Sequence, residues 1–310
     1  MYDIIIIGGG SAGLTAAVYA CRKKLKTLIV SIDIGGQTNL TSHIENYPGT
    51  GPMNGIELMQ KFREDAVKFG AEIIMGKVMK VEKVAERHFK IELANNESYE
   101  SKSIILAYGK VPKSLGIIGE EKFMGRGVST CVTCDAPLYR KRPVAIIGGG
   151  NSAVEGALEL AELTDKVYLI HRRDKFRADE ITVEKLKSNK SITLELNSIT
   201  KEIKGDKNVS GIVIENLITK NSKEIKVDGA FIEIGYVVDT KMVEHLVKLN
   251  EAKEVVKNGR CETSCSGIFA AGDVTDTPYK QTVISAGEGA TAALECYRYL
   301  TGAKGPLLDW

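Results

Sequence analysis

The sequence lacks the features that direct a protein into or across a membrane. No apolar run approaches the roughly 20 residues that a membrane-spanning helix requires. Residues 1–4 lead directly into an apolar strand pattern, without the basic segment and cleavage site of a secretory signal peptide. We therefore expect a cytoplasmic protein that does not act at a membrane.

Basic tracts and a disulfide framework are also missing. The 42 lysines and arginines nearly balance 40 aspartates and glutamates, so the net charge is only +2. Binding to nucleic acid depends on concentrated positive charge, so we expect no nucleic-acid partner. Six cysteines in 310 residues indicate a reducing compartment and not a disulfide-stapled fold. The length allows two domains, each with its own core.

Two of the six cysteines form a C-x-x-C motif, Cys131 to Cys134, which Asp135 follows directly. In such a chain this spacing indicates either half of a zinc site or a redox-active dithiol. Zinc would need four ligands, but the next cysteines along the chain, Cys261 and Cys265, lie about 130 residues further on at a different spacing. Asp135 offers a proton donor and acceptor for thiol–disulfide exchange. Redox chemistry is therefore favoured over zinc, and we predict no metal site.

A glycine-rich motif follows the first apolar strand, at residues 3–7. Gly8, Gly10 and Gly13 match G-x-G-x-x-G between this strand and a helical stretch. In that context the glycines let a dinucleotide approach the backbone, and the start of the helix receives its pyrophosphate. Asp33 lies at the distance expected for a ribose-binding acid, just past the predicted strand end at Ser31. We predict a dinucleotide site formed by Gly8, Gly10, Ser11, Ala12, Gly13 and Asp33.

The same pattern recurs 140 residues later. Gly148, Gly150 and Ala153 repeat the first motif, so we predict an α/β fold with two Rossmann-like dinucleotide-binding domains. After the second strand of this copy, at 166–170, arginines stand where the first copy has its acid. Arginine accommodates the 2′-phosphate of NADPH, so this copy should bind NADPH. The predicted contacts are Gly148, Gly150, Asn151, Ser152, Ala153, His171, Arg172, Arg173 and Arg177.

Four other stretches complete the pattern. The loops at 35–38 and 44–49 are too polar and glycine-rich for a core, and long loops of this kind are usually functional. An apolar strand at 267–271 ends in Gly272-Asp273, whose carboxylate can approach a ribose or ribityl hydroxyl. Residues 192–235 lie between the second copy of the motif and this strand. They alternate apolar segments with polar turns, which predicts an antiparallel flap.

Together these motifs resemble the bacterial and archaeal low-molecular-weight thioredoxin reductases, nearly from end to end. The matching residues are 8–13, 35–37, 45–49, 125–129, 131–135, 148–153, 171–177 and 271–273. The resemblance implies an NADPH domain at 113–241, inserted into an FAD domain that is split into 1–112 and 242–310. It also implies that FAD occupies the first site, with further contacts from Gly36, Gln37, Asn46, Gly272, Asp273, Lys280, Gln281 and Thr282.

The resemblance implies a function as well. NADPH would reduce FAD, FAD would reduce a Cys131–Cys134 disulfide, and the dithiol would reduce thioredoxin or a thioredoxin-like protein. Cys134 would face the flavin, Cys131 would attack the thioredoxin disulfide, and Asp135 would donate or accept the proton. Family members are homodimers, so a homodimer is expected. The alternatives are a flavoprotein of this fold with a glutaredoxin-like or peroxidase-linked partner, and a non-catalytic zinc- or nucleotide-sensing protein.

The chain departs from the family pattern at four places, one of which has Cys265-Ser266 where Val-Pro is usual before Gly-Ile-Phe. The chain has Ala107-Tyr108-Gly109 where Ala-Thr-Gly is common in the family, so contacts with the flavin should differ at Tyr108. Tyr236 follows Gly235 where many members have histidine, which leaves Asp135 as the better acid. Lys280 replaces a common arginine before Gln281. None of these departures affects the residues expected to transfer electrons.

Overall fold

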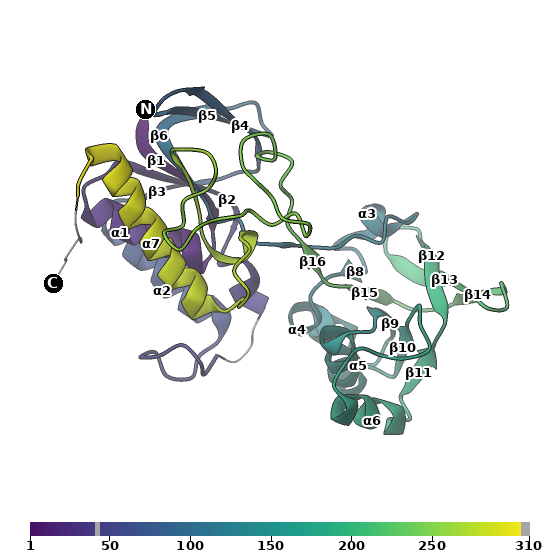
Figure 1. Cartoon of the computed structure of the whole chain (residues 1–310). Helices are drawn as coiled ribbons and strands as arrows, with labels where there is room; N and C mark the ends of the chain where they lie inside the picture. Colours follow the sequence, from purple (N-terminus) through teal and green to yellow (C-terminus); the bar gives the residue numbers. More distant parts are fainter. Residues whose placement is uncertain (41–43, 305–310) are drawn as a thin grey trace. The chain divides into compact units, whose positions relative to one another are not determined.

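The computed structural model describes residues 1–40 and 44–304, and it divides the chain into two compact units (Figure 1). Unit 1 contains residues 1–111 and 237–310, and unit 2 contains residues 112–236. Residues 305–310, at the end of the predicted FAD-domain segment 242–310, lie outside the described residues. Two short strands, β7 (Val111–Pro112) and β16 (Tyr236–Val237), carry the chain between the units and pair with each other. Unit 2 is thus an insertion in unit 1.

Unit 1 is built on a seven-stranded sheet. Its parallel part has the order β3 (Glu72–Met75), β2 (Thr27–Ile34), β1 (Tyr2–Gly9), β6 (Ser98–Leu106), and β17 (Ile268–Ala270) also pairs with β6. From β6 the sheet continues into the antiparallel strands β5 (His88–Leu93) and β4 (Val78–Ala85). The helices are α1 (Ser11–Arg22), α2 (Gly55–Lys68) and α7 (Thr282–Thr301), with the short 3₁₀ turns η1 (Gly36–Leu40) and η3 (Gly272–Val274).

The central strand β1 is buried on both faces of this sheet. Its four isoleucines, residues 4–7, are at most 3% exposed. Because side chains alternate along a strand, Ile4 and Ile6 join the cluster that contains α1 and α7, and Ile5 and Ile7 join the cluster of the opposite face. A strand covered on both sides reads as an unbroken apolar run, as the sequence predicts here.

Unit 2 contains a second parallel sheet and a separate antiparallel flap. The sheet order is β11 (Ile192–Glu195), β10 (Lys166–Ile170), β9 (Pro143–Gly148), β15 (Gly229–Glu233) and β8 (Val128–Ser129). The flap consists of β12 (Ser198–Gly205), β13 (Val209–Asn216) and β14 (Ser222–Ile225). The helices are α3 (Glu120–Phe123), α4 (Val132–Asp135), α5 (Asn151–Leu163) and α6 (Glu180–Ser188), with the 3₁₀ turn η2 (Ala136–Tyr139) after α4.

The predicted fold class is confirmed: two Rossmann-like α/β units, one inserted into the other. Two local predictions were wrong. The tract at 192–235 is not antiparallel throughout, because its first strand pairs in parallel with β10 and its last with β9. Strand β2 continues past Ser31 to Ile34, because Ile34 pairs with Gly9 across a register shift. Asp33 therefore belongs to the strand. Among the described residues, no helix is long and apolar enough to cross a membrane.

The contact between α1 and α7 depends on a glycine. A Cβ atom on Gly289 would lie 2.1 Å from the backbone oxygen of Ala12, so Gly289→Ala would force the two helices apart. Overpacking of this kind costs about 1–3 kcal/mol. In the same helix, Gly287 is exposed, and a Cβ atom there would have no neighbour within 4 Å. Gly287→Ala should therefore stabilise the protein by about 0.5–1 kcal/mol.

We expect the urea midpoint of unfolding, followed by circular dichroism, to fall for Gly289→Ala and to rise for Gly287→Ala. Since both variants add the same methyl group to α7, helix propensity alone would shift both midpoints upward. An unchanged or raised midpoint for Gly289→Ala would show that α1 and α7 are not in close contact there.

Candidate active site

The first nucleotide-binding turn joins β1 to α1 in unit 1. Gly8 has a positive φ of 114°, and a Cβ atom there would lie 2.3 Å from the backbone oxygen of Ala107. A Cβ atom on Gly13 would lie 1.9 Å from the oxygen of Gly8, so only glycine lets α1 start this close to the strand. Gly10 caps the helix without a side-chain hydrogen bond, and the nearest atom to its absent Cβ is 3.9 Å away. The N–H groups of the first turn can therefore receive a pyrophosphate.

The side chain of Asp33 shapes the loop that follows β2. Its Oδ1 accepts a hydrogen bond of 3.0 Å from the backbone N–H of Gly36, which closes the turn into η1. The absent Cβ of Gly36 would lie 3.9 Å from the Cα of Gly10. The predicted ribose-binding acid and the loop residue Gly36 thus lie beside the first turn. Ser11 and Ala12 are buried in the first turn of α1.

Two segments far apart in the sequence meet at the start of α7. The Asn46 amide donates to Oε1 of Gln281 at 3.2 Å, and the hydroxyls of Thr38 and Thr282 are 3.2 Å apart. The sequence indicated these loops separately, and the structure brings them together in unit 1. Gln37 also joins this region, through its Nε2 at 3.5 Å from the backbone oxygen of Lys110.

Asp273 lies in a largely buried position at the end of β17. Gly272 has a φ of 78°, and a Cβ atom there would lie 3.0 Å from the Ala12 methyl. The Ser285 hydroxyl donates to Asp273 at 3.5 Å. Burial raises the pKa of the Asp273 carboxyl, against the opposing charge of Lys280 and Lys110. This carboxyl is thus suited to accept hydrogen bonds from the hydroxyl groups of a ligand.

The protein itself engages the ammonium group of Lys280. Its Nζ donates to the backbone oxygen of Thr275 at 2.6 Å and to that of Asp273 at 3.4 Å, and it pairs with Glu254 at 3.3 Å. Burial alone would raise the pKa of Glu254, but the Asn250 amide and the lysine charges outweigh it and hold this pKa below its usual value. Lys280 therefore fixes the loop that carries Asp273.

Sequence reasoning missed Glu288, which organises the same loop from α7. Its Oε2 accepts the backbone N–H of Gly272 at 2.7 Å, while Oε1 pairs with Lys257 at 3.1 Å and accepts the Thr277 hydroxyl. A charged residue inside the small-residue run at 285–290 was the only signal available for it. Glu288 is thus a support for Gly272 and Asp273.

The second nucleotide-binding turn joins β9 to α5 in unit 2. A Cβ atom on Gly148 would lie 2.2 Å from the backbone oxygen of Glu233 and 2.6 Å from the methyl of Ala153. Gly150 caps α5 without a side-chain hydrogen bond and has nothing within 4 Å of its absent Cβ. The start of α5 is therefore open to an anion, like that of α1. The side-chain amide of Asn151 is bonded to Asp179: its Nδ2 donates to Oδ2 of Asp179 at 3.3 Å, and its Oδ1 accepts from the backbone N–H of Asp179 at 3.0 Å.

His171 forms a wall of the second turn. A Cβ atom on Gly149 would lie 2.0 Å from its ring, which stacks on Phe176 at 5.2 Å and lies 3.0 Å from the oxygen of Lys175. Burial lowers the pKa of His171, and the neighbouring arginines lower it further, so the ring is neutral near pH 7. The arginines Arg172, Arg173 and Arg177 are exposed, and none is in an ion pair with another described residue.

The backbone of Arg177 is held beside the second turn. Its N–H donates to the oxygen of Gly149 at 2.8 Å, while Ser152 lies exposed in the first turn of α5. Guanidinium groups that are free of carboxylate partners among the described residues, as these three are, can bind a phosphate group.

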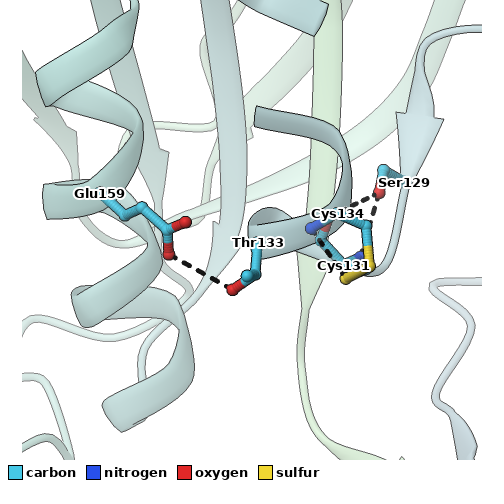
Figure 2. The surroundings of a disulfide bond; sticks show 5 residues. All are labelled: Ser129, Cys131, Thr133, Cys134 and Glu159. Atoms are coloured by element: carbon cyan, nitrogen blue, oxygen red, sulfur yellow. Dashed lines mark hydrogen bonds between the residues drawn. A yellow bond between two sulfur atoms is a disulfide. The ribbon is translucent and has the colours of Figure 1, made fainter. Parts of the chain in front are cut away.

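Cys131 and Cys134 form a disulfide on the short helix α4 (Figure 2). Ser129 holds the backbone of Cys131: the Oγ of Ser129 accepts a hydrogen bond from the Cys131 N–H at 3.0 Å and donates to the Cys131 backbone oxygen at 3.2 Å. The Cys134 N–H donates to the sulfur of Cys131 at 3.1 Å. Cys134 is exposed, whereas Cys131 and Asp135 are half-buried.

Bonded to each other, the two sulfurs offer no thiolate to zinc. Within residues 1–40 and 44–304, no group of three histidine, cysteine or acidic side chains is placed to hold a metal ion. Cys261 and Cys265 are unpaired thiols.

Sequence reasoning also missed two carboxyl groups that interact with the helix of the disulfide. Glu159 on α5 has Oε2 at 3.5 Å from the Thr133 hydroxyl (Figure 2). The backbone of Val132 acts on the pKa of Glu233, at the end of β15. Burial raises the pKa of both carboxyls, that of Glu233 to about 7. Neither residue belongs to a motif, so no pattern in the sequence selects them.

Comparison with known proteins places this geometry in a family. The sequence profile described as pyridine nucleotide-disulphide oxidoreductase matches residues 2–289. The chain is 42% identical to a glucosaminate ammonia-lyase of Pseudomonas fluorescens, over 97% of this chain and 96% of that protein. It is 41% identical to a thioredoxin reductase of Helicobacter pylori, over 97% and 99% of the two chains.

A solved structure agrees with these sequence relatives. The thioredoxin reductase of Lactococcus lactis is 38% identical and superimposes with a TM-score of 0.82, covering 98% of this chain and 100% of that one. The resemblance seen in the sequence is thereby confirmed. With two nucleotide-binding turns, a disulfide helix and a profile match over most of its length, the chain belongs to the pyridine nucleotide-disulphide oxidoreductase family.

Proposed function

We propose that this protein is a thioredoxin reductase, which carries electrons from NADPH by way of FAD to the Cys131–Cys134 disulfide and from the dithiol to thioredoxin or a thioredoxin-like protein. The proposal rests on a disulfide with an exposed Cys134, in the same unit as a nucleotide-binding turn with unpaired arginines. Relatives that bear this name match over nearly the whole chain. A cytoplasmic location and a homodimer belong to the same proposal.

The first turn fits FAD. The open start of α1, framed by Gly8, Gly10, Ser11, Ala12 and Gly13, would hold its pyrophosphate, and Asp33 would bind a ribose hydroxyl. The polar loops that meet at the start of α7 would line the rest of the cofactor, through Gly36, Gln37, Asn46, Gly272, Asp273, Lys280, Gln281 and Thr282. Bound there, the flavin supplies the two-electron link between nicotinamide and disulfide.

The second turn fits NADPH. Its pyrophosphate would lie at the open start of α5, at Gly148, Gly150, Asn151, Ser152 and Ala153. The 2′-phosphate would meet Arg172, Arg173 and Arg177, while the neutral ring of His171 forms the wall of the turn.

The hydrogen bond to Cys131 supports different roles for the two thiols. Once the disulfide is reduced, the Cys134 N–H remains placed to stabilise a Cys131 thiolate. That thiolate attacks a sulfur of the thioredoxin disulfide, which forms a mixed disulfide and releases a thiolate that takes up a proton. Cys134 then attacks the Cys131 sulfur, restores the internal disulfide and releases reduced thioredoxin. Asp135, the last residue of α4, would accept and return the proton of Cys134.

The relative from Pseudomonas fluorescens bears the name of an ammonia-lyase. Elimination of ammonia transfers no electrons to a disulfide, so the Cys131–Cys134 pair would have no part in it. Incubation of the protein with glucosaminate should release no ammonia, whereas NADPH and oxidised thioredoxin should react together. The opposite pair of results would refute the proposed function.

The two cysteines should differ when each is replaced. Cys134→Ser leaves the attacking thiol without the resolving one, so it should form a stable mixed disulfide with thioredoxin, visible by non-reducing electrophoresis. Cys131→Ser should not trap thioredoxin, because its remaining thiol would face the flavin. Both variants should lose thioredoxin reduction and keep NADPH-driven bleaching of the flavin, since hydride transfer does not involve the disulfide.

Replacement of the unpaired thiol Cys265 by serine is the matched control and should leave turnover unchanged. Trapping by Cys131→Ser alone would reverse the assignment of the thiols. Full turnover in either variant would remove the dithiol from the reaction.

The arginines should select NADPH over NADH. Each hydrogen bond between charged groups contributes about 1.5–3 kcal/mol, so loss of one lowers the efficiency with NADPH roughly 10- to 100-fold. Arg172→Ala with Arg173→Ala should therefore reduce kcat/KM for NADPH by at least that factor and leave the value for NADH nearly unchanged. The exposed Lys207, in the turn of the flap, provides the control variant Lys207→Ala. An equal loss with both nucleotides would mean that these arginines do not bind the 2′-phosphate.

A further inference from the structure

Ser129 joins the helix of the disulfide to the sheet of unit 2. It is the last residue of β8, where it pairs with Phe231 of β15, and its side chain is buried. Figure 2 shows its hydroxyl bonded to the backbone of Cys131, two residues later. The Oγ atom accepts the Cys131 N–H at 3.0 Å and donates to the Cys131 backbone oxygen at 3.2 Å. One buried side chain therefore bonds both polar backbone groups of the first cysteine.

These two hydrogen bonds hold Cys131 in the extended conformation from which α4 starts. Cys131 has φ of −137° and ψ of 102°, and it is the N-cap residue of that helix. Its backbone oxygen accepts a further hydrogen bond from the Asp135 N–H at 3.3 Å, and its sulfur accepts the Cys134 N–H at 3.1 Å. The position of the Cys131 backbone therefore determines whether the sulfur meets the Cys134 N–H.

The hold on Cys131 does not depend on the disulfide. In the oxidised protein, the bond between the two sulfurs links the ends of the turn from Cys131 to Cys134. Reduction breaks this link, and the place of the Cys131 sulfur then depends on contacts that survive reduction. Both hydrogen bonds of Ser129 go to backbone atoms, so neither is lost when the sulfurs separate. The next residue, Val132, is held by packing, since a Cβ atom on Gly156 of α5 would lie 2.9 Å from its side chain.

The reactivity of Cys131 depends on this place of its sulfur. Attack on a partner disulfide requires a thiolate. An N–H group that donates to the sulfur favours the charged form over the thiol. Without the Ser129 hydroxyl, the Cys131 backbone would lose the two hydrogen bonds that keep the sulfur on the Cys134 N–H. A smaller fraction of Cys131 would then be thiolate at a given pH.

We propose that Ser129 is a positioning residue for the attacking thiolate: its two hydrogen bonds hold the Cys131 backbone so that the sulfur stays on the Cys134 N–H after the disulfide is reduced. The inference deepens the proposed function and depends on it for the reaction with thioredoxin. Ser129 acts through Cys131 and exchanges no proton or electron itself. Its loss should therefore change the amount of thiolate and leave hydride transfer to the flavin intact.

Replacement of Ser129 by alanine removes the hydroxyl and adds no atom, so it tests the two hydrogen bonds without overpacking. The comparison is made in Cys134→Ser proteins, which keep the N–H of residue 134 and leave Cys131 as the only thiol of the segment 127–140. Alkylation of Cys131 by iodoacetamide, followed by mass spectrometry of its peptide, measures the thiolate fraction at each pH. The midpoint of this pH profile should be about one unit higher with Ser129→Ala, a roughly tenfold loss of thiolate at pH values below both midpoints. An unchanged midpoint would overturn the inference.

Ser101→Ala is the matched control. Ser101 is buried in β6 of unit 1, and its hydroxyl donates to the backbone oxygen of Ser103, two residues later, at 2.8 Å. Its replacement removes the same kind of hydrogen bond in the unit that does not contain the disulfide, so the midpoint for Cys131 should not move. An equal shift in Ser101→Ala would show that alkylation reports a general loosening of the fold, and it would contradict the proposal.

Turnover gives a second readout in the protein with both cysteines. With NADPH as donor and 5,5′-dithiobis(2-nitrobenzoate) as a small disulfide, kcat/KM for the disulfide should fall about threefold in Ser129→Ala at acid pH. The loss is smaller than that of thiolate because a more basic thiolate is a better nucleophile. At alkaline pH, where both proteins are fully thiolate, the variant should be at least as fast as wild type. KM for NADPH and the rate of flavin reduction should be unchanged.

An equal loss of kcat/KM at every pH would make Ser129 a support of the fold and contradict the proposal. If the wild type reduces no disulfide, the proposed function fails. The alkylation profiles need no turnover, and they still decide whether Ser129 holds Cys131 as a thiolate.

Discussion

Close approach of backbone to backbone at two strand-to-helix turns is the constraint on which the rest of the structure depends. In unit 1, a Cβ atom on Gly13 would lie 1.9 Å from the oxygen of Gly8. In unit 2, one on Gly148 would lie 2.2 Å from the oxygen of Glu233. These contacts place the starts of α1 and α5 at the carboxyl edges of two parallel sheets, with N–H groups facing outward. Both ligand sites follow from that geometry, since an anion can bind where no side chain fills the space.

The disulfide also lies at the start of a helix, the short helix α4, and an N–H group of that helix contacts one of its sulfurs. Helix α4 has only four residues. The Cys134 N–H donates to the sulfur of Cys131, and this contact favours a thiolate there. One short turn thereby sets the reactivity of Cys131.

The sequence predicts the parts of the fold that depend on local rules. Strand, glycine turn and helix occur together in both copies, and the arginines after β10 stand where the structure leaves them exposed and without ion pairs among the described residues. Prediction from the sequence fails where the structure depends on a contact between segments that are distant in the chain. The direction of β11 depends on its pairing with β10, and the length of β2 on a register shift opposite Gly9. Glu233 and Glu288 belong to no motif, and their importance arises from burial, which a linear pattern does not record.

The buried carboxylates of the two units differ in a way that separates support from function. In unit 1, Glu254 and Glu288 pair with lysines, and such paired, hydrogen-bonded charges hold loops without a free charge in the interior. In unit 2, Glu233 is half-buried, and no lysine or arginine in the described chain pairs with it. A side chain chosen for stability alone would be apolar or paired at this position. An unpaired carboxyl of this kind, whose pKa burial raises to about 7, is typical of a functional site.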